Sequence, residues 1–123
     1  MEKLTIKELK QRKELFLDLF ADGKSDIALE FDIPLEQLEN KHFVYAYYSY
    51  EDYQGDAYLL FIENDKLYEV DAHHCSCYGL EGQFEPEEVP IEVLYYRLEN
   101  KIWNWDHLEV AFALPIDGKE VES

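Results

Sequence analysis

The chain has 123 residues, of which 47% are hydrophobic and 15% aromatic. Its 28 Asp and Glu side chains outnumber 11 Lys and Arg, which gives a formal net charge of −17. This composition excludes a disordered acidic tail, because such tails are poor in aromatic residues. The apolar stretches are short and interrupted by charges, so no membrane-spanning segment is expected and the length fits one domain.

The amino terminus leads directly into an amphipathic segment, without the apolar run and small-residue cleavage site of a signal peptide. The two cysteines are separated by a single residue, which is not the pattern of a disulfide framework. Both features lead us to expect a cytoplasmic protein.

The negative charge is distributed unevenly. Residues 1–13 carry five basic and two acidic side chains, a local balance of +3, so the remaining 110 residues have a balance of −20. Such a surface repels nucleic acid, whose phosphates are themselves negative, and attracts cationic proteins. The net charge also exceeds the magnitude of about 2–8 that keeps a small domain soluble.

Residues 1–41 are predicted to be helical. Thr5-Ile6-Lys7-Glu8 has the spacing of a capping box, and apolar side chains then recur at near-helical spacing as far as Phe20. A second short helix is predicted over residues 25–31, and Pro34 opens a further helical turn.

Residues 42–72 are predicted to form a sheet. Strands are expected over residues 43–50, 57–62 and 66–70, because these runs are rich in aromatic and branched side chains. Asn64-Asp65 has the composition of a tight hairpin turn. The segment therefore predicts a three-stranded antiparallel meander.

The faces of the first predicted strand follow from the alternation of side chains along an extended chain. Every second residue, counted from the start of the strand at residue 43, should lie on one face, and the residues between them should lie on the other face. The two expected sets are Phe43, Tyr45 and Tyr47, and Val44, Ala46 and Tyr48.

After the sheet, residues 73–89 are predicted to be a loop and residues 90–100 a helix with an apolar stripe at Ile91, Leu94, Tyr95 and Leu98. Residues 101–123 are ambiguous, since 108–114 alternate like a strand while Asp106 is a suitable helix cap. The predicted fold is a single α+β domain, a meander packed against helices from both ends of the chain.

The loop gathers four side chains of metal-ligating type within five residues: His73, His74, Cys75 and Cys77. Zinc takes four nitrogen or sulfur ligands in tetrahedral geometry, and His42 or His107 would serve as a further ligand. Structural zinc sites usually combine two separated pairs, however, and buried thiols also pack as small apolar groups. We therefore expect no cofactor, and keep zinc as the alternative.

Catalysis is not expected. A reactive cysteine needs positive surroundings to lower its pKa, and here acidic side chains flank both thiols. The sequence contains no phosphate-binding loop, nucleophile elbow or zinc-protease helix.

Two runs of the sequence are unusual: Tyr50-Glu51-Asp52-Tyr53-Gln54-Gly55-Asp56-Ala57 and the later run His74-Cys75-Ser76-Cys77-Tyr78-Gly79-Leu80-Glu81-Gly82-Gln83-Phe84-Glu85-Pro86-Glu87-Glu88. These runs resemble a family of small, largely uncharacterised proteins of bacteriophages and prophages. At Phe84 relatives often carry Trp, a difference that concerns packing. The resemblance covers about residues 43–99. It implies a virus-encoded accessory protein in a bacterial cytoplasm, and no particular activity.

Charge and resemblance together favour an acidic protein that occupies the nucleic-acid-binding groove of a basic host protein, as DNA mimics do. Such an inhibitor would act against a defence system, in anti-restriction or anti-CRISPR fashion, or against a transcription factor. The predicted partner-binding residues are aromatic and acidic side chains of the strands and the loop: Tyr48, Tyr50, Glu51, Asp52, Tyr53, Asp56, Glu81, Glu85, Glu87 and Glu88.

Two other interpretations stay open. In the first, zinc held by the loop orders a protein-interaction module that meets its partner through the loop instead of the acidic face. In the second, the chain forms a homodimer by pairing its aromatic sheet.

Overall fold

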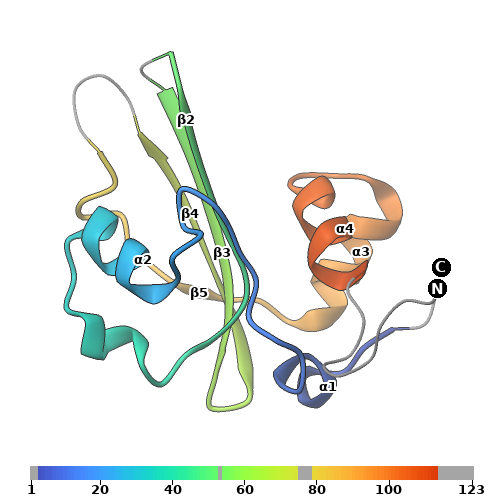
Figure 1. Ribbon diagram of the computed structural model, residues 1–123. Coiled ribbons are helices and arrows are strands. Elements are labelled where there is room, and N and C mark those ends of the chain that lie inside the picture. Colours follow the sequence, from blue (N-terminus) through green and yellow to red (C-terminus); the bar gives the residue numbers. More distant parts are fainter. Residues whose placement is uncertain (1–2, 53, 75–78, 114–123) are drawn as a thin grey trace, which may run out of the picture.

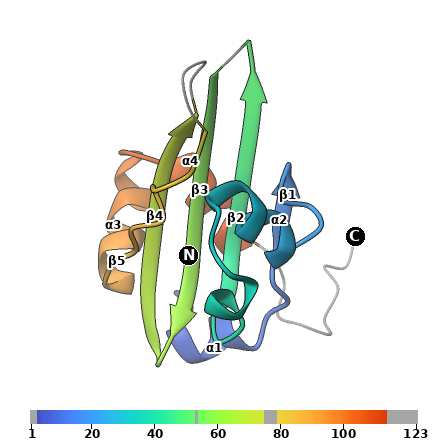
Figure 2. The same ribbon diagram turned by 90° about the vertical axis from the view of Figure 1, so that its left-hand side faces the viewer.

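A mixed five-stranded sheet lies at the centre of the computed structural model, which describes residues 3–52, 54–74 and 79–113 (Figure 1). The strands are ordered β1-β2-β3-β4-β5 across the sheet, as Figure 2 shows face-on. β1 pairs with β2 in parallel, and the other neighbours are antiparallel. The strand bounds are β1 Phe16–Asp18, β2 His42–Glu51, β3 Gln54–Glu63, β4 Lys66–His74 and β5 Glu87–Glu88.

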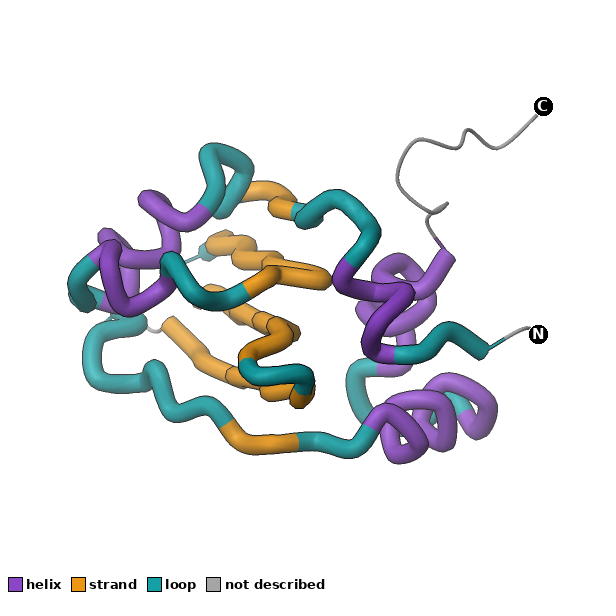
Figure 3. Tube along the Cα trace, turned by 90° about the horizontal axis from the view of Figure 1, so that it is seen from below, coloured by secondary structure: helices purple, strands orange, loops and turns teal. Residues whose placement is uncertain are grey.

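Helices cover both faces of the sheet (Figures 1 and 3). On one face lie α2 (Lys24–Phe31) and the 3₁₀ turn η1 (Leu35–Leu38). On the other face lie α1, α3 and α4, with bounds Ile6–Lys10, Ile91–Asn100 and Trp105–Ala113. Each face therefore has its own apolar core, one rich in phenylalanine and the other in leucine and tyrosine.

This architecture confirms a single α+β domain. The predicted three-stranded meander corresponds to β2, β3 and β4, but the sheet as a whole is larger and mixed. The two additional strands are short and lie at the two edges.

The prediction of one helix from Thr5 to Phe20 is wrong in its second half. The capping box forms, since Glu8 N donates to Thr5 Oγ1 at 3.2 Å and Thr5 N donates to Glu8 Oε1 at 2.9 Å, but α1 ends at Lys10. The chain then runs along β2 as β1, where Phe16 packs on Phe43 at 5.9 Å between ring centroids. The spacing of apolar residues in this segment fits a strand as well as a helix. Pairing with β2 therefore determines that the segment is a strand.

The face assignment of β2 is right except at its start. Tyr45 and Tyr47 face α3 and α4, and Ala46 and Tyr48 face α2. A bulge between residues 43 and 45 places Val44 on the same face as Tyr45 and turns Phe43 to the opposite one. An inserted residue of this kind shifts the alternation by one position.

The tight turn at Asn64-Asp65 is confirmed. Both residues have positive φ angles, 53° and 61°, as a type I′ hairpin turn requires. The turn closes directly on the pair Glu63 and Lys66 and thereby fixes the register of the whole β3–β4 hairpin.

The segment predicted as a loop, 73–89, begins and ends in the sheet. His73 and His74 complete β4, and Glu87 and Glu88 form β5 beside it. The ambiguous region contains helix α4, whose buried Leu108 and Ala111 are three residues apart and face the sheet. In the described part of the chain, no helix combines the length and the apolar character that a bilayer crossing requires.

Candidate partner-binding site

The β3–β4 hairpin places polar side chains on the sheet face that α3 and α4 cover only in part. In the register set by the tight turn, Asp56 lies opposite His73 and Tyr58 opposite Asp71. Alternation along β4 puts Glu69, Asp71 and His73 on the same face. An apolar strand face thus becomes acidic towards the end of β4.

Two adjoining pockets lie along these side chains, with volumes of about 240 Å³ and 150 Å³. Both pockets are lined by Asp71 and Trp103, which form the wall between them. We call the combined depression the acidic groove and define it by the five carboxylates and the indole that line it: Asp56, Glu69, Asp71, Glu85, Glu87 and Trp103.

His73 bridges two carboxylates at the mouth of the groove. Its Nδ1 lies 2.7 Å from Asp56 Oδ1, and its Nε2 lies 3.3 Å from Asp71 Oδ2. Because ionised carboxylates only accept hydrogen bonds, the two contacts together favour the imidazolium form. The hydrogen bond to Asp56 is the main reason why the pKa of His73 is raised.

The carboxylate of Asp71 is less well compensated than this contact suggests. Partial burial raises its pKa, and the nearby His73 opposes this effect without cancelling it. A further cation beside Asp71, in the wall between the two pockets, would therefore stabilise the ionised form of its carboxylate.

Glu69 has a structural role at the floor of the groove. It accepts a hydrogen bond from the Tyr58 hydroxyl at 2.8 Å and two from Arg97, at 3.0 and 3.2 Å. Burial raises the pKa of Tyr58, so its hydroxyl stays protonated and donates. Arg97 in turn lies over the indole of Trp103, with Cζ 4.8 Å from the ring centroid. The network fixes the position of Trp103.

The turn between α3 and α4 forms the opposite wall. Asn104 there has a φ of 56°, and its amide contacts Tyr58, whose pKa this contact lowers slightly against the dominant effect of burial. The oxygen of the Asn104 amide is buried and makes no hydrogen bond. His107 lines the same pocket, and its Nδ1 is hydrogen-bonded to the Tyr45 hydroxyl at 2.7 Å. This wall is therefore aromatic and polar, facing the acidic wall of the sheet.

The predicted partner-binding residues divide into those in the groove and those elsewhere. Asp56, Glu85 and Glu87 lie together in the groove. Tyr50, Glu51 and Asp52 lie instead at the end of the β2–β3 hairpin, which extends beyond the helices (Figures 1 and 2).

The remaining predicted residues face other directions. Tyr48 is 3% exposed and packs on Phe20, so its ring is not available to a partner. Glu88 alternates with Glu87 and lies on the α2 side of β5, and Glu81 accepts a hydrogen bond from the backbone of its own loop. Tyr53 lies outside the described residues.

The two histidines of the candidate zinc site point to opposite faces of the sheet. His73 contacts Asp56 and Asp71 on the α3–α4 side, whereas the ring of His74 packs on Tyr50 at 4.3 Å on the α2 side. Cys75 and Cys77 lie outside the described residues, and no group of three metal-ligating side chains occurs within them. One metal ion therefore cannot be bound by both histidines while β4 keeps this conformation.

Sequence reasoning missed Glu69, Asp71, Trp103 and Asn104 as members of the site. The signal for the two carboxylates was present, because a two-residue turn at 64–65 implies the pairing of Tyr58 with Asp71. Trp103 and Asn104 come from a segment far along the chain, and only the packing of α3 and α4 brings them to the sheet.

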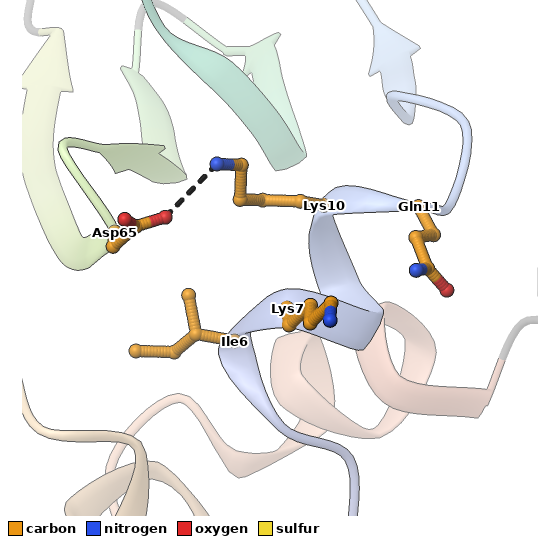
Figure 4. A pocket seen from close by; sticks show the side chains of 5 residues that line it. All are labelled: Ile6, Lys7, Lys10, Gln11 and Asp65. Carbon is orange, nitrogen blue, oxygen red and sulfur yellow. Dashed lines mark hydrogen bonds and ion pairs between the residues drawn. The ribbon is translucent and has the colours of Figure 1, made fainter.

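A larger depression of about 670 Å³ lies at α1, at the opposite end of the β3–β4 hairpin (Figure 4). It is lined by Ile6, Lys7, Lys10, Gln11 and Asp65. Figure 4 shows Lys10 reaching across to Asp65, with Nζ 2.9 Å from the carboxylate. Among the described residues that line this depression, the ion pair leaves Lys7 as the one uncompensated cation, which is little positive charge for a nucleic-acid site.

Comparison of the chain with known protein families, with curated proteins and with solved structures finds no match. The site is therefore interpreted from its own chemistry.

Proposed function

We propose that this protein binds a basic, nucleic-acid-binding protein through the acidic groove and thereby blocks that partner's access to nucleic acid. The observation that carries the proposal is the convergence of five carboxylates around one exposed tryptophan. Four of them lie on β3, β4 and β5, and the fifth lies just before β5. Carboxylates spread over a rigid sheet substitute for phosphates, and an indole supplies the buried anchor that protein interfaces need.

The arrangement also supports binding rather than catalysis. Four of the five carboxylates belong to strands, which hold them in place, and Glu69 is compensated internally by Arg97. The groove thus offers a fixed negative field to an approaching protein, and such a field accelerates association at low ionic strength.

The resemblance to phage and prophage proteins suggests the biological setting. A virus-encoded protein in a bacterial cytoplasm meets restriction enzymes, CRISPR effectors and transcription factors, all of which present basic grooves to nucleic acid. Counter-defence is the role that combines this setting with the acidic groove.

The test compares two variants of equal charge. The groove variant carries Asp56→Asn, Glu85→Gln and Glu87→Gln, and the control carries Glu36→Gln, Glu39→Gln and Glu109→Gln on exposed positions elsewhere. Each variant and the original protein are immobilised and exposed to bacterial host lysate. Retained proteins are identified by mass spectrometry at about 50 and 200 mM salt, with and without competing duplex DNA.

We expect a basic protein that the original and the control retain, that the groove variant loses, and that DNA and salt both displace. Retention by all three proteins alike, or retention that neither DNA nor salt affects, would contradict the proposal. The matched control separates the groove from the general negative charge of the chain.

A further inference from the structure

We infer that the pocket between Asp71 and Trp103 receives one arginine side chain of the partner. This inference rests on the proposed function and names the group that the groove recognises. Four features of the pocket point to arginine: its size, its charge, its aromatic wall and one amide oxygen without a hydrogen bond.

The size of the pocket fits a single side chain. Its volume of about 240 Å³ is below the roughly 300–1,000 Å³ of sites for drug-sized ligands. It is nevertheless about eight times the roughly 30 Å³ that one water molecule occupies in the liquid.

The charge of the pocket selects a cation. Asp56 and Asp71 line it, and no lysine or arginine does so among the described residues. At the edge of the pocket His73, which is 66% exposed, contacts both carboxylates, so an entering guanidinium would share them with His73 or displace it. The pKa of Asp71 is raised by partial burial, so the contact with His73 does not fully offset the cost of burying this negative charge.

The aromatic wall already binds a guanidinium. Trp103 is 52% exposed, and Arg97 of the same chain lies over its ring at 4.8 Å. The indole also lines both pockets, so a second cation in the groove would lie against it. Indole is the best aromatic partner for such contacts, and arginine is the more frequent cation.

Asn104 supplies an independent indication of a ligand. The oxygen of its side-chain amide is buried without a hydrogen bond, and the residue lines the pocket. Its backbone is held at a φ of 56°, in the left-handed region. A buried amide oxygen without a partner costs stability, and a donor group entering the pocket would satisfy it.

Arginine meets these requirements better than lysine. Its planar guanidinium has five N–H donors in a fixed geometry, enough donors for both Asp71 and the Asn104 oxygen. The same plane stacks on the indole of Trp103. A lysine ammonium is a compact point charge that would satisfy the carboxylate alone.

The test uses three capped tripeptides with the sequence Gly-X-Gly, in which X is arginine, lysine or citrulline. Citrulline keeps the shape of arginine and removes its charge. Each peptide is titrated into ¹⁵N-labelled protein while the indole N–H signal of Trp103 and the side-chain amide signal of Asn104 are followed by NMR.

We expect saturable shifts of both signals with the arginine peptide, weaker binding of the lysine peptide and no saturable shift with citrulline. Trp103→Ala should weaken arginine binding about threefold, the effect of an exposed cation–π contact. Asp71→Asn should weaken it more, and the matched change Asp65→Asn at the opposite hairpin end should have no effect.

Equal binding of the citrulline or lysine peptide would overturn the inference, as would equal weakening by Asp71→Asn and Asp65→Asn. The outcome is independent of the lysate experiment. If the arginine peptide binds at the pocket and no basic protein is retained, the proposed function fails alone; if a basic protein is retained through the groove and the peptide does not bind, the pocket inference fails alone.

Discussion

The side chain of Gln83 acts as a strand partner for His73. Its Oε1 accepts a hydrogen bond from His73 N at 2.9 Å, and its Nε2 donates to His73 O at 2.7 Å. One amide thus satisfies both backbone groups at the edge of β4, beyond the point where β5 pairs with it. Unpaired strand edges promote association between chains, so this contact protects the end of the sheet.

Gln83→Ala should therefore destabilise the protein and expose the edge of β4. It removes the two hydrogen bonds to His73 and a third to Gly79 O at 2.8 Å. At roughly 1 kcal/mol for each bond, the free energy of unfolding should fall by about 2–3 kcal/mol. Urea denaturation measures this loss, and sizing chromatography detects self-association. Gln37→Ala, at an exposed position, is the control and should change neither property.

Arg97→Ala should be one of the most destabilising single changes on this face of the sheet. It leaves the carboxylate of Glu69, which is 8% exposed, without its cation. Loss of one member of a buried ion pair costs about 3–5 kcal/mol, which urea denaturation would show. The double change Arg97→Met with Glu69→Leu should restore much of the stability, because no charge then remains unpaired. A double variant no more stable than Arg97→Ala would contradict this account of the network.

The contacts of His73 should make stability depend on pH. Its pKa is raised in the folded protein above the ordinary value of about 6.5, chiefly by the hydrogen bond to Asp56. The resulting stabilisation is fully present below pH 6.5 and is lost as the pH rises through the raised pKa. Burial also raises the pKa of Asp71. This shift likewise makes the folded protein less stable as the pH rises, but it does so at more acidic pH.

Melting temperatures of the original protein and of His73→Gln, measured from pH 5.5 to 8.5, test this dependence. The original protein should lose stability with rising pH across this window, and the variant should lose much less. Parallel curves for the two proteins would show that His73 does not contribute.

We expect the purified protein to contain much less than one zinc ion per chain. His73 and His74 point to opposite faces, and His73 is already in contact with two carboxylates. Elemental analysis of untagged protein measures the content, and Cys75→Ser with Cys77→Ser should leave the melting temperature nearly unchanged. One zinc per chain, lost together with folding in that double variant, would instead support the zinc-ordered interaction module.

The sequence was sufficient where local chemistry determines structure. The capping box of α1, the stripe of α3 and the type I′ turn at Asn64-Asp65 all depend on residues close together in the chain. The sequence was insufficient for β1, because the apolar residues of 14–20 fit the spacing of a helix as well as that of a strand. Only pairing with β2 selects the strand. The bulge at Val44 had no evident local signal either.

The candidate site shows the same division. Its acidic wall follows from the alternation of β4 and the register of one hairpin, so Asp71 could have been placed opposite Tyr58 from the sequence. Its aromatic wall could not, because Trp103 reaches the sheet only through the packing of α3 and the bridge from Glu69 through Arg97. Side chains from distant segments meet by tertiary packing, for which a single sequence offers no spacing rule.

The parallel pairing of β1 with β2 has a consequence for the order of folding. Phe16 is paired with Ala46, 30 positions later, whereas β2, β3 and β4 are joined by short turns. Local hairpins close at little entropic expense and long loops close later, so the three central strands can assemble before the amino-terminal segment docks. Three of the five carboxylates of the groove belong to β3 and β4, so the groove is built largely from the early-forming half of the molecule, while the amino-terminal strand completes the opposite edge last.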